Sequence, residues 1–239
     1  MKGVVFVKYM DYICDCCELI SVELLDRIEE AKKGCESLGI GVFSDEYAEK
    51  ILKRKPIRPY IERARIIYSI KNVDFVFKVT DEKNIVINKE EFFYNNSKEK
   101  KYHIGYAPGT YDLLHQGHLE HLSEAASQCD ILVVGINDDD LVFSYKGRKP
   151  SMPSKYRADI VSKLKIVDAT FIADTLERKK ANKWIIEKFG SPIDAVFIGS
   201  DWINKDLHNA ENLKIVFTYR DPETMKTRST TFYRKQLGL

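Results

Sequence analysis

The chain repeats itself, and this repeat limits the folds that are open to it. When the 239-residue sequence is shifted by 94 positions, residues 41–79 align with residues 135–173 without a gap, and 13 of the 39 aligned positions are identical. A period this long indicates a duplicated domain, not a solenoid of short repeats. Both copies show the pattern strand, helix, strand, loop, helix, strand, which is typical of a parallel α/β sheet with right-handed crossovers.

The repeat and the polar stretches divide the chain into three parts. Residues 95–101 are almost entirely polar or charged, which is typical of the end of a linker. We therefore predict a first domain over residues 1–80, a linker over 81–101 and a second domain over 102–239.

The second copy carries one stretch with a clear chemical meaning, Gly-Thr-Tyr-Asp-Leu-Leu-His-Gln-Gly-His at residues 109–118. An apolar run at 102–107 predicts a strand before it, and the spacing of apolar residues predicts a helix after it. His115 and His118 can then face one ligand at the start of that helix. The free backbone N–H groups and the dipole of a helix N-terminus attract an anion. The pattern indicates a phosphate site suited to nucleotidyl transfer.

Residues 109–118 resemble the signature of the cytidylyltransferase family, G-T-F-D-x-x-H-x-G-H, and the glycerol-3-phosphate cytidylyltransferases in particular. The resemblance extends over residues 102–239. Gly-Ser-Asp-Trp at 199–202 follows an apolar run, as the family's G-D-D-W follows a strand. Arg220 and Ser-Thr-Thr at 229–231 are similar to the two ends of the family's R-T-x-G-I-S-T-T loop.

The resemblance implies an α/β chain of two tandem Rossmann-like nucleotidyltransferase domains with parallel sheets, of which the first is degenerate. In the register of the repeat, Ser21 stands where His115 stands, and Leu24 stands where His118 stands. Glu23 takes the place of the glycine between the histidines. The first copy therefore lacks the residues that the proposed chemistry needs, and we expect catalysis in the second copy alone.

Transfer to the α-phosphate of a nucleotide requires positioning of the reactants and stabilisation of negative charge. We expect His115 and His118 to donate hydrogen bonds to the α- and β-phosphates. The family resemblance implies that Lys146 contacts both the transferred phosphates and the phosphorylated substrate, and that Arg157 lies near phosphate. It further implies that Lys179 binds the second substrate. The catalytic residues expected are His115, His118, Lys146 and Arg157.

A wider set of residues is expected to bind the nucleotide. Asp112 should order the turn by accepting backbone N–H bonds. By resemblance, Asp201 and Trp202 help to hold cytosine and ribose, although Trp202 could also pack on the core. The loop from Arg220 to Ser229 has eight intervening residues where the family has four, and it could reach the second substrate. The full set is Gly109, Thr110, Tyr111, Asp112, Gly117, Arg148, Gly199, Asp201, Trp202, Arg220, Ser229, Thr230 and Thr231.

The sequence favours a CTP-dependent cytidylyltransferase that acts on a small phosphorylated alcohol and releases a CDP-alcohol and pyrophosphate. Candidate alcohols are glycerol 3-phosphate or a similar compound, phosphoethanolamine and phosphocholine. Mg²⁺ should accompany the triphosphate, as in most such transfers, and it should sit mainly on the nucleotide because no carboxylate cluster marks a metal cage. Two alternatives stay open: an adenylyltransferase for a sugar phosphate or pantetheine phosphate, and a non-catalytic nucleotide sensor. We expect the first copy to act as a built-in partner in an intramolecular pseudo-dimer, and a homodimer of whole chains stays open beside it.

Composition excludes several other classes. A formal net charge of +2 gives no electrostatic case for binding nucleic acid, and no apolar run approaches the ~20 residues that span a bilayer. Five cysteines without a secretion signal favour the cytoplasm. Cys14-Asp15-Cys16-Cys17 lacks a second pair at zinc-site spacing, so free thiols are the better interpretation.

Overall fold

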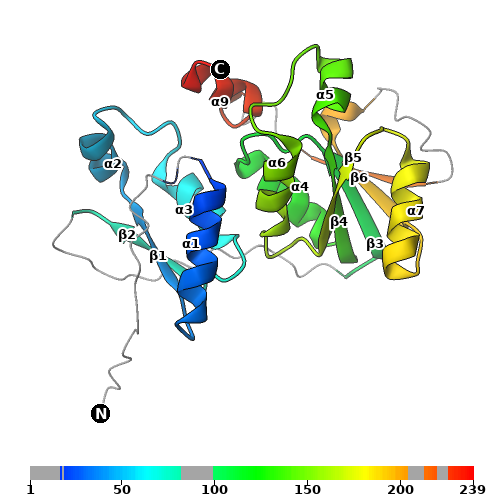
Figure 1. The fold of residues 1–239 in the computed structure, drawn as a ribbon, viewed down its shortest axis with the longest axis horizontal. Helices are drawn as coiled ribbons and strands as arrows, with labels where there is room; N and C mark the ends of the chain where they lie inside the picture. The colour runs from blue at the N-terminus through cyan, green and yellow to red at the C-terminus, as the bar shows by residue number, and fades with distance from the viewer. Residues whose placement is uncertain (1–16, 18, 82–98, 204–212, 220–225) are drawn as a thin grey trace. The chain divides into compact units, whose positions relative to one another are not determined.

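The computed structural model describes residues 17, 19–81, 99–203, 213–219 and 226–239. The chain divides into two compact units, Met1–Phe93 and Tyr94–Leu239 (Figure 1). The predicted bounds of the domains and of the linker remain a proposal, because most of the linker lies outside the described residues. The cysteine cluster Cys14-Asp15-Cys16-Cys17 also lies outside them, apart from Cys17, which is a buried free thiol.

The second unit is built on a five-stranded sheet in the order β5-β4-β3-β6-β7, in which each pairing between described strands is parallel. The chain enters at the central strand, proceeds to one edge and then crosses to the other side of the entry strand. In such a sheet, ligands bind where the direction of winding reverses, here between β3 and β6. The strands are β3 (Tyr102–Gly109), β4 (Cys129–Asn137), β5 (Ala169–Ala173), β6 (Ala195–Gly199) and β7 (Lys214–Thr218).

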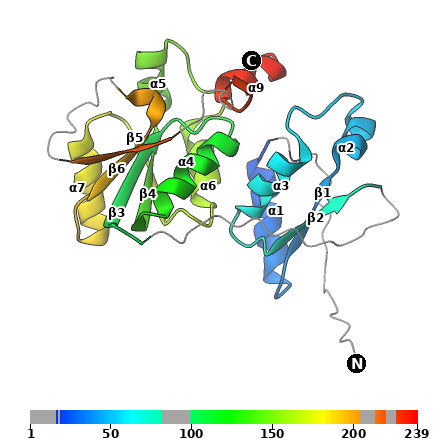
Figure 2. The ribbon, with the colours of Figure 1, turned by 180° about the vertical axis from the view of Figure 1, so that it is seen from behind.

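Helices cover both faces of this sheet, with α4 and α6 on one face and α7 on the other (Figures 1 and 2). The alternation of side chains along β3 sends Ile104 and Tyr106 towards α7, where they pack with Ala181 and Ile185. The helical elements are α4 (Gln116–Ala126), α5 (Asp139–Lys146), α6 (Ser154–Ser162), α7 (Arg178–Phe189), the short 3₁₀ helix η1 (Ser200–Trp202) and α9 (Thr230–Leu237).

The first unit repeats part of this plan with a two-stranded parallel sheet of β1 and β2. Its α2, α3 and β2 coincide residue for residue with α5, α6 and β5 at the offset of 94. The predicted α/β fold with two tandem parallel units, the first degenerate, is therefore confirmed. The elements are α1 (Val22–Lys33), β1 (Gly39–Phe43), α2 (Asp45–Leu52), α3 (Tyr60–Tyr68) and β2 (Phe75–Val79).

One shared hydrogen-bond pair explains why the dipeptide Val-Asp occurs in both copies. The Asp168 carboxylate accepts a hydrogen bond from the Leu132 N–H at 2.7 Å, and the Asp168 N–H donates to the Leu132 carbonyl at 3.0 Å. Asp74 and Leu38 make the same two bonds at 2.6 and 2.9 Å. Each aspartate thus fixes the start of one strand against its neighbour, and the duplicated register persists in the backbone.

Side-chain caps define where several helices begin. Ser44 accepts a hydrogen bond from the backbone of α2, Asp138 from that of α5 and Ser229 from that of α9, which satisfies N–H groups that lack a partner within the helix. The longest described helices, α1 and α7, have 12 residues each. No helix in the described part of the chain has the length and apolar character needed to cross a membrane.

Gly135 in β4 is required by close packing. A Cβ atom there would lie 2.3 Å from the hydroxyl oxygen of Tyr106, whose ring is buried. We predict that Gly135→Ala lowers the free energy of unfolding by about 1–3 kcal/mol, because the ring must shift in a packed core. Urea denaturation measures the change. Gly34→Ala is the control, since its nearest neighbour would lie at 3.7 Å. An unchanged midpoint for Gly135→Ala would contradict the packing described.

Candidate functional site

A cavity of about 660 Å³ opens at the carboxyl ends of β3, β4 and β6, at the point where the winding of the sheet reverses. It lies within the second unit. Most of the residues predicted from the sequence line it: Gly109, Thr110, Tyr111, Asp112, His115, Gly117, His118, Lys146, Arg148, Gly199, Asp201, Trp202, Ser229, Thr230 and Thr231. Residues that the sequence analysis did not single out as site residues complete the lining: Pro108, His121, Asn137, Val142, Tyr145, Lys149, Pro150, Leu176, Arg178 and Ile198.

Two of the predicted site residues that the structure describes do not line the cavity. Arg157 is fully buried beside it, and Lys179 is exposed. Arg220 lies outside the described residues. The sequence left open whether Trp202 lies at the site or packs on the core. In the structure it lines the cavity and also packs against the apolar core between the sheet and α7.

The turn between β3 and α4 holds two residues in the left-handed backbone region. Tyr111 has φ 51° and Leu113 has φ 49°, and both side chains are buried. This conformation costs about 1–3 kcal/mol for a residue other than glycine and persists only where the surroundings enforce it. Cys17 occupies the position of Tyr111 in the first copy and also has φ 51°. The same backbone conformation at this position therefore does not require the residues of the signature.

Asp112 holds this turn to the loop that precedes α6. Its carboxylate accepts hydrogen bonds from the backbone N–H groups of Ser151 at 2.9 Å and Met152 at 3.1 Å. Arg234 of α9 lies 3.7 Å from the same carboxylate. Both carboxylate oxygens are thus engaged, which is the ordering role expected of Asp112 and leaves it poorly placed to act as a base.

His115 is fixed in one orientation and one tautomer. Its Nδ1 accepts a hydrogen bond from the Gly117 N–H at 3.1 Å, so that the ring itself caps α4. A neutral ring bonded in this way carries its proton on Nε2. That nitrogen lies 3.4 Å from Oγ1 of Thr230 at the start of α9. His115 therefore presents a hydrogen-bond donor on the side where the two helices begin.

His118 stacks on His115, with 3.8 Å between the ring centroids and 24° between the planes. The edge of Tyr111 contacts it from another side, at 5.2 Å between centroids. His118 is half-buried, whereas His115 is almost completely buried. One turn further on, His121 also lines the cavity, and its Nδ1 lies 2.6 Å from the hydroxyl of Thr218 at the end of β7.

The N-terminus of α9 forms a second anion-attracting end at the same cavity. Ser229 caps the helix by accepting from the Phe232 N–H at 3.3 Å. Thr230 donates its hydroxyl to the carbonyl of Asp112 at 3.1 Å, which fixes the start of α9 to the signature turn. With α4, two helix N-termini therefore meet at one cavity, a setting in which phosphate binds readily.

A chain of polar side chains surrounds Thr110. Its hydroxyl accepts from Nζ of Lys146 at 3.1 Å and lies 3.1 Å from the hydroxyl of Tyr145, which in turn accepts from Nδ2 of Asn137 at 3.0 Å. Burial, helped by the charge of Arg148, lowers the pKa of Lys146. Asn137 and Tyr145 were missed in the sequence, although a polar residue ending the apolar run of β4 was a usable signal.

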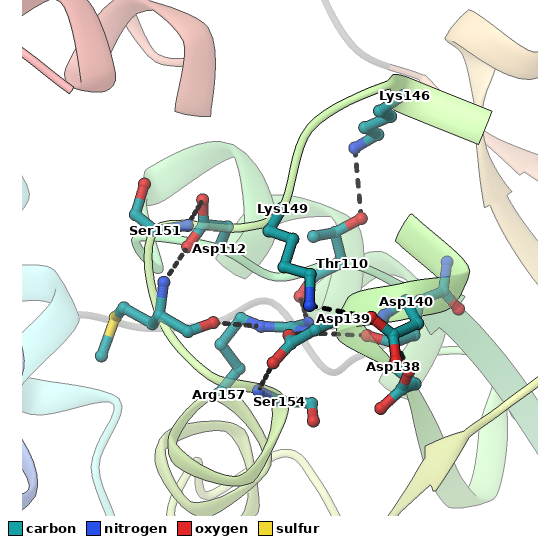
Figure 3. Close-up of polar contacts among 12 residues, drawn as sticks. Thr110, Asp112, Asp138, Asp139, Asp140, Lys146, Lys149, Ser151, Ser154 and Arg157 are labelled. Carbon is teal, nitrogen blue, oxygen red and sulfur yellow. Dashed lines mark hydrogen bonds and ion pairs between the residues drawn. The ribbon is translucent and has the colours of Figure 1, made fainter. Parts of the chain in front are cut away.

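Arg157 binds protein groups and not the cavity. Its guanidinium donates to the carbonyls of Thr110, Met152 at 2.9 Å and Asn137 at 2.8 Å, and to the carboxylate of Asp139 at 2.6 Å (Figure 3). These groups come from the signature turn, the end of β4, the start of α5 and the loop before α6. Arg157 therefore positions the loops that form the site.

The first turn of α7 supplies a different cation from the one predicted. Lys179 is exposed, whereas Arg178 is 7% exposed and lines the cavity. The guanidinium carbon of Arg178 lies 5.9 Å from the ring centroid of Tyr106. Alignment with a family lysine identified the correct turn of the chain, but it did not establish which residue of that turn faces inward.

In a comparison with known protein families, residues 106–234 match the family described as cytidylyltransferase-like. A relative named bifunctional protein HldE, from Helicobacter hepaticus, is 35% identical over 135 residues, which cover 55% of this chain and 26% of the relative. HldE from Hyphomonas neptunium is 42% identical over 73 residues, or 30% of this chain and 15% of the relative. The chain thus spans about a quarter or less of the length of these curated relatives.

Among solved structures, a lipopolysaccharide core biosynthesis protein from Thermoplasma volcanium is 24% identical. The match covers 50% of this chain and 96% of that protein, with a TM-score of 0.39.

The two copies allow a matched test of the Arg157 network. Arg63 in the first copy makes the corresponding bonds, to the Arg58 carbonyl at 3.0 Å and to Asp45 at 2.7 Å. We predict that Arg157→Met lowers the free energy of unfolding by about 3–5 kcal/mol, because it leaves the partners of a buried cation unpaired. It should also weaken nucleotide binding, since the cavity loops lose their anchor.

Arg63→Met is the control, because it removes the same kind of network away from the cavity. It should lower the stability of the first unit and leave nucleotide affinity unchanged. Denaturant unfolding and calorimetric titration with CTP measure the two effects. Equal losses of affinity in both variants would contradict the positioning role of Arg157.

Proposed function

The chain belongs to the cytidylyltransferase-like family, and on that premise we propose that its second unit transfers a cytidylyl group from CTP to a small phosphorylated alcohol. A phosphate oxygen of the alcohol attacks the α-phosphorus, and the bond from that phosphorus to the oxygen bridging to the β-phosphate breaks. The products are a CDP-alcohol and pyrophosphate. The attacking oxygen is already ionised, so the step needs no base.

The fixed donor on His115 carries this proposal. Because the Gly117 N–H occupies Nδ1, His115 donates through Nε2–H, which lies 3.4 Å from Oγ1 of Thr230 and would also reach an anion held between the starts of α4 and α9. His118 stacks beside it, and the N-terminus of α9 approaches from the other side. Donors held in place before the reaction stabilise the charge that grows on phosphate oxygens without reorganising. We assign to His115 and His118 the α- and β-phosphates.

We infer the remaining contacts to the phosphates from the other residues that line the cavity. Ser229, Thr230 and Thr231 at the start of α9 suit the terminal phosphates of the triphosphate, because they combine hydroxyl groups with the helix dipole. Lys146 reaches Thr110 across the turn and suits the transferred phosphate. Arg148 lines the same cavity as a further cation.

The choice of CTP is supported by the family and by the turn after β6. Asp201 and Trp202 line the cavity next to the strand end where the winding reverses, and an indole beside a carboxylate can hold a base and a ribose. ATP remains the alternative donor, with a sugar phosphate or pantetheine phosphate as acceptor. The name of the HldE relatives specifies no nucleotide, so it does not decide between CTP and ATP.

Magnesium is proposed as a companion of the nucleotide and not as a resident of the protein. No group of three or more metal-binding side chains gathers in the described part of the chain. Asp112 uses both carboxylate oxygens within the protein. When bound with the triphosphate, the ion would supply charge neutralisation on the phosphates.

The assembly of the protein also remains a proposal. We propose that the full chain functions as one polypeptide in which the degenerate copy takes the place of a second subunit, as an intramolecular pseudo-dimer. Light scattering on the full chain should then give the mass of a monomer. A stable dimer of whole chains would instead favour the homodimer.

We predict that CTP with a small phosphorylated alcohol releases pyrophosphate and that His118→Ala lowers kcat by roughly 10²–10³-fold, since one donor to the reacting phosphates is lost. His118 is preferred to His115 because it does not cap α4. His103→Ala is the matched control, because His103 is exposed and paired with Asp130 at 3.3 Å. Coupled detection of pyrophosphate with CTP or ATP against a panel of phosphorylated alcohols measures the rates.

Each result separates the candidates. Release with ATP alone would identify an adenylyltransferase and refute the proposal of CTP. Nucleotide binding without release for any pair would favour the non-catalytic sensor. Equal rates for His118→Ala and the wild type would refute the assignment of the histidines.

A further inference from the structure

Arg178 is a buried cation that the described protein does not fully satisfy. Its side chain is 7% exposed at the wall of the cavity. Among the residues that the structure describes, none accepts a hydrogen bond from its Nε and none forms an ion pair with it. A guanidinium offers five N–H donors and stays charged in proteins, so leaving a donor unmade in a buried site is costly.

The neighbour that Arg178 does have cannot neutralise it. Tyr106 lies against the guanidinium, and burial raises the pKa of its phenol to about 12, so the phenol stays neutral near pH 7. Burial also lowers the pKa of Arg178, and the Tyr106 phenol beside it offsets only part of this effect.

The position of Arg178 in its helix adds a second cost. It is the first residue of α7, and the preceding Glu177 makes no side-chain cap. A cation at a helix N-terminus meets the positive end of the dipole, whereas an anion there is stabilised. The uncapped N–H groups and the guanidinium both favour one type of occupant, an anion at this wall of the cavity.

The two faces of the sheet indicate which anion that is. The paired histidines and the start of α9, which are proposed for the phosphates of CTP, contact each other at the start of α4, which covers one face of the sheet. Arg178 begins α7 on the other face, where its guanidinium lies against Tyr106 of the central strand β3 and lines the cavity beside Leu176. In-line attack on the α-phosphorus requires the acceptor to approach opposite the departing pyrophosphate.

We propose that Arg178 binds the phosphate of the acceptor, a phosphomonoester of a small polyol, and so determines which phosphorylated alcohol reacts. The inference rests on the proposed nucleotidyl transfer. The guanidinium and the start of α7 hold the dianion, Lys146 lies between it and the nucleotide, and Leu176 and Val142 face the carbon chain. Arg178 takes the role that sequence alignment gave to the exposed Lys179.

Steady-state kinetics of the full chain test this assignment with Arg178→Gln, Arg178→Lys and the neighbouring control Lys179→Gln. Arg178→Gln should raise KM for glycerol 3-phosphate, or for the best acceptor in the panel, by about 10- to 100-fold, as expected for a lost charged hydrogen bond. KM for CTP should not change. Arg178→Lys keeps the charge and should lose less, and Lys179→Gln should behave as the wild type.

The outcomes distinguish this proposal from the one on which it rests. A rise confined to KM for CTP, or no rise at all, would overturn the role of Arg178. If Arg178→Gln does not fold, Arg178→Lys decides, because equal acceptor KM values for lysine and arginine would overturn a guanidinium-specific contact.

If the wild type turns over no pair, the proposed function fails, and calorimetric binding of glycerol 3-phosphate decides the question alone. Binding to the wild type that is lost in Arg178→Gln and kept in Lys179→Gln supports the site. Equal binding by all three proteins, or binding by none, overturns it.

Discussion

The site depends on a buried cation that is bonded to the protein behind the cavity wall. Arg157 is buried among the signature turn, the end of β4 and the start of α5, and its guanidinium donates to groups from each of them. Burying a charge is expensive unless hydrogen bonds surround it, so the loops can be held in place only together. In the first copy, the buried Arg63 likewise bonds to the Arg58 carbonyl and to Asp45, although this copy lacks the histidines. The network is therefore a property of the fold that does not depend on the histidines.

The two copies show how little must change for the chemistry to be lost. Ser21 caps α1 by accepting from the Leu24 N–H at 3.2 Å, and His115 caps α4 at the equivalent position. Either residue satisfies the helix, but only the imidazole keeps a second nitrogen to donate to an anion. Likewise Leu52 stands in the first copy where Lys146 stands in the second, and it packs against an apolar cluster. A substitution at a single position can thus remove a group needed for the chemistry while the helix keeps its cap or its packing.

The sequence was informative where spacing along the chain determines the structure. The repeat indicated the register of both units, and the ten residues from Gly109 indicated the turn, the helix start and one part of the cavity wall. It was less informative about which side of an element a residue faces. Adjacent residues at a helix start point about 100° apart, so an alignment that is correct to one residue could not separate Arg178 from Lys179. Nor could it show that Arg157 turns inward, because three of its four acceptors are backbone carbonyls, which the side-chain pattern does not reveal.

The same limitation shows where specificity can arise. In a doubly wound sheet, the reversal of winding places helix N-termini around one cavity whatever the side chains are, so binding of some phosphate follows from topology. Topology does not decide which phosphate binds where. That choice falls to side chains at the helix starts, the imidazole on α4, the hydroxyls on α9 and the guanidinium on α7. The buried guanidinium of Arg178 has an Nε without a hydrogen-bond partner among the described residues, and an unsatisfied buried group at a cavity is where function is expected.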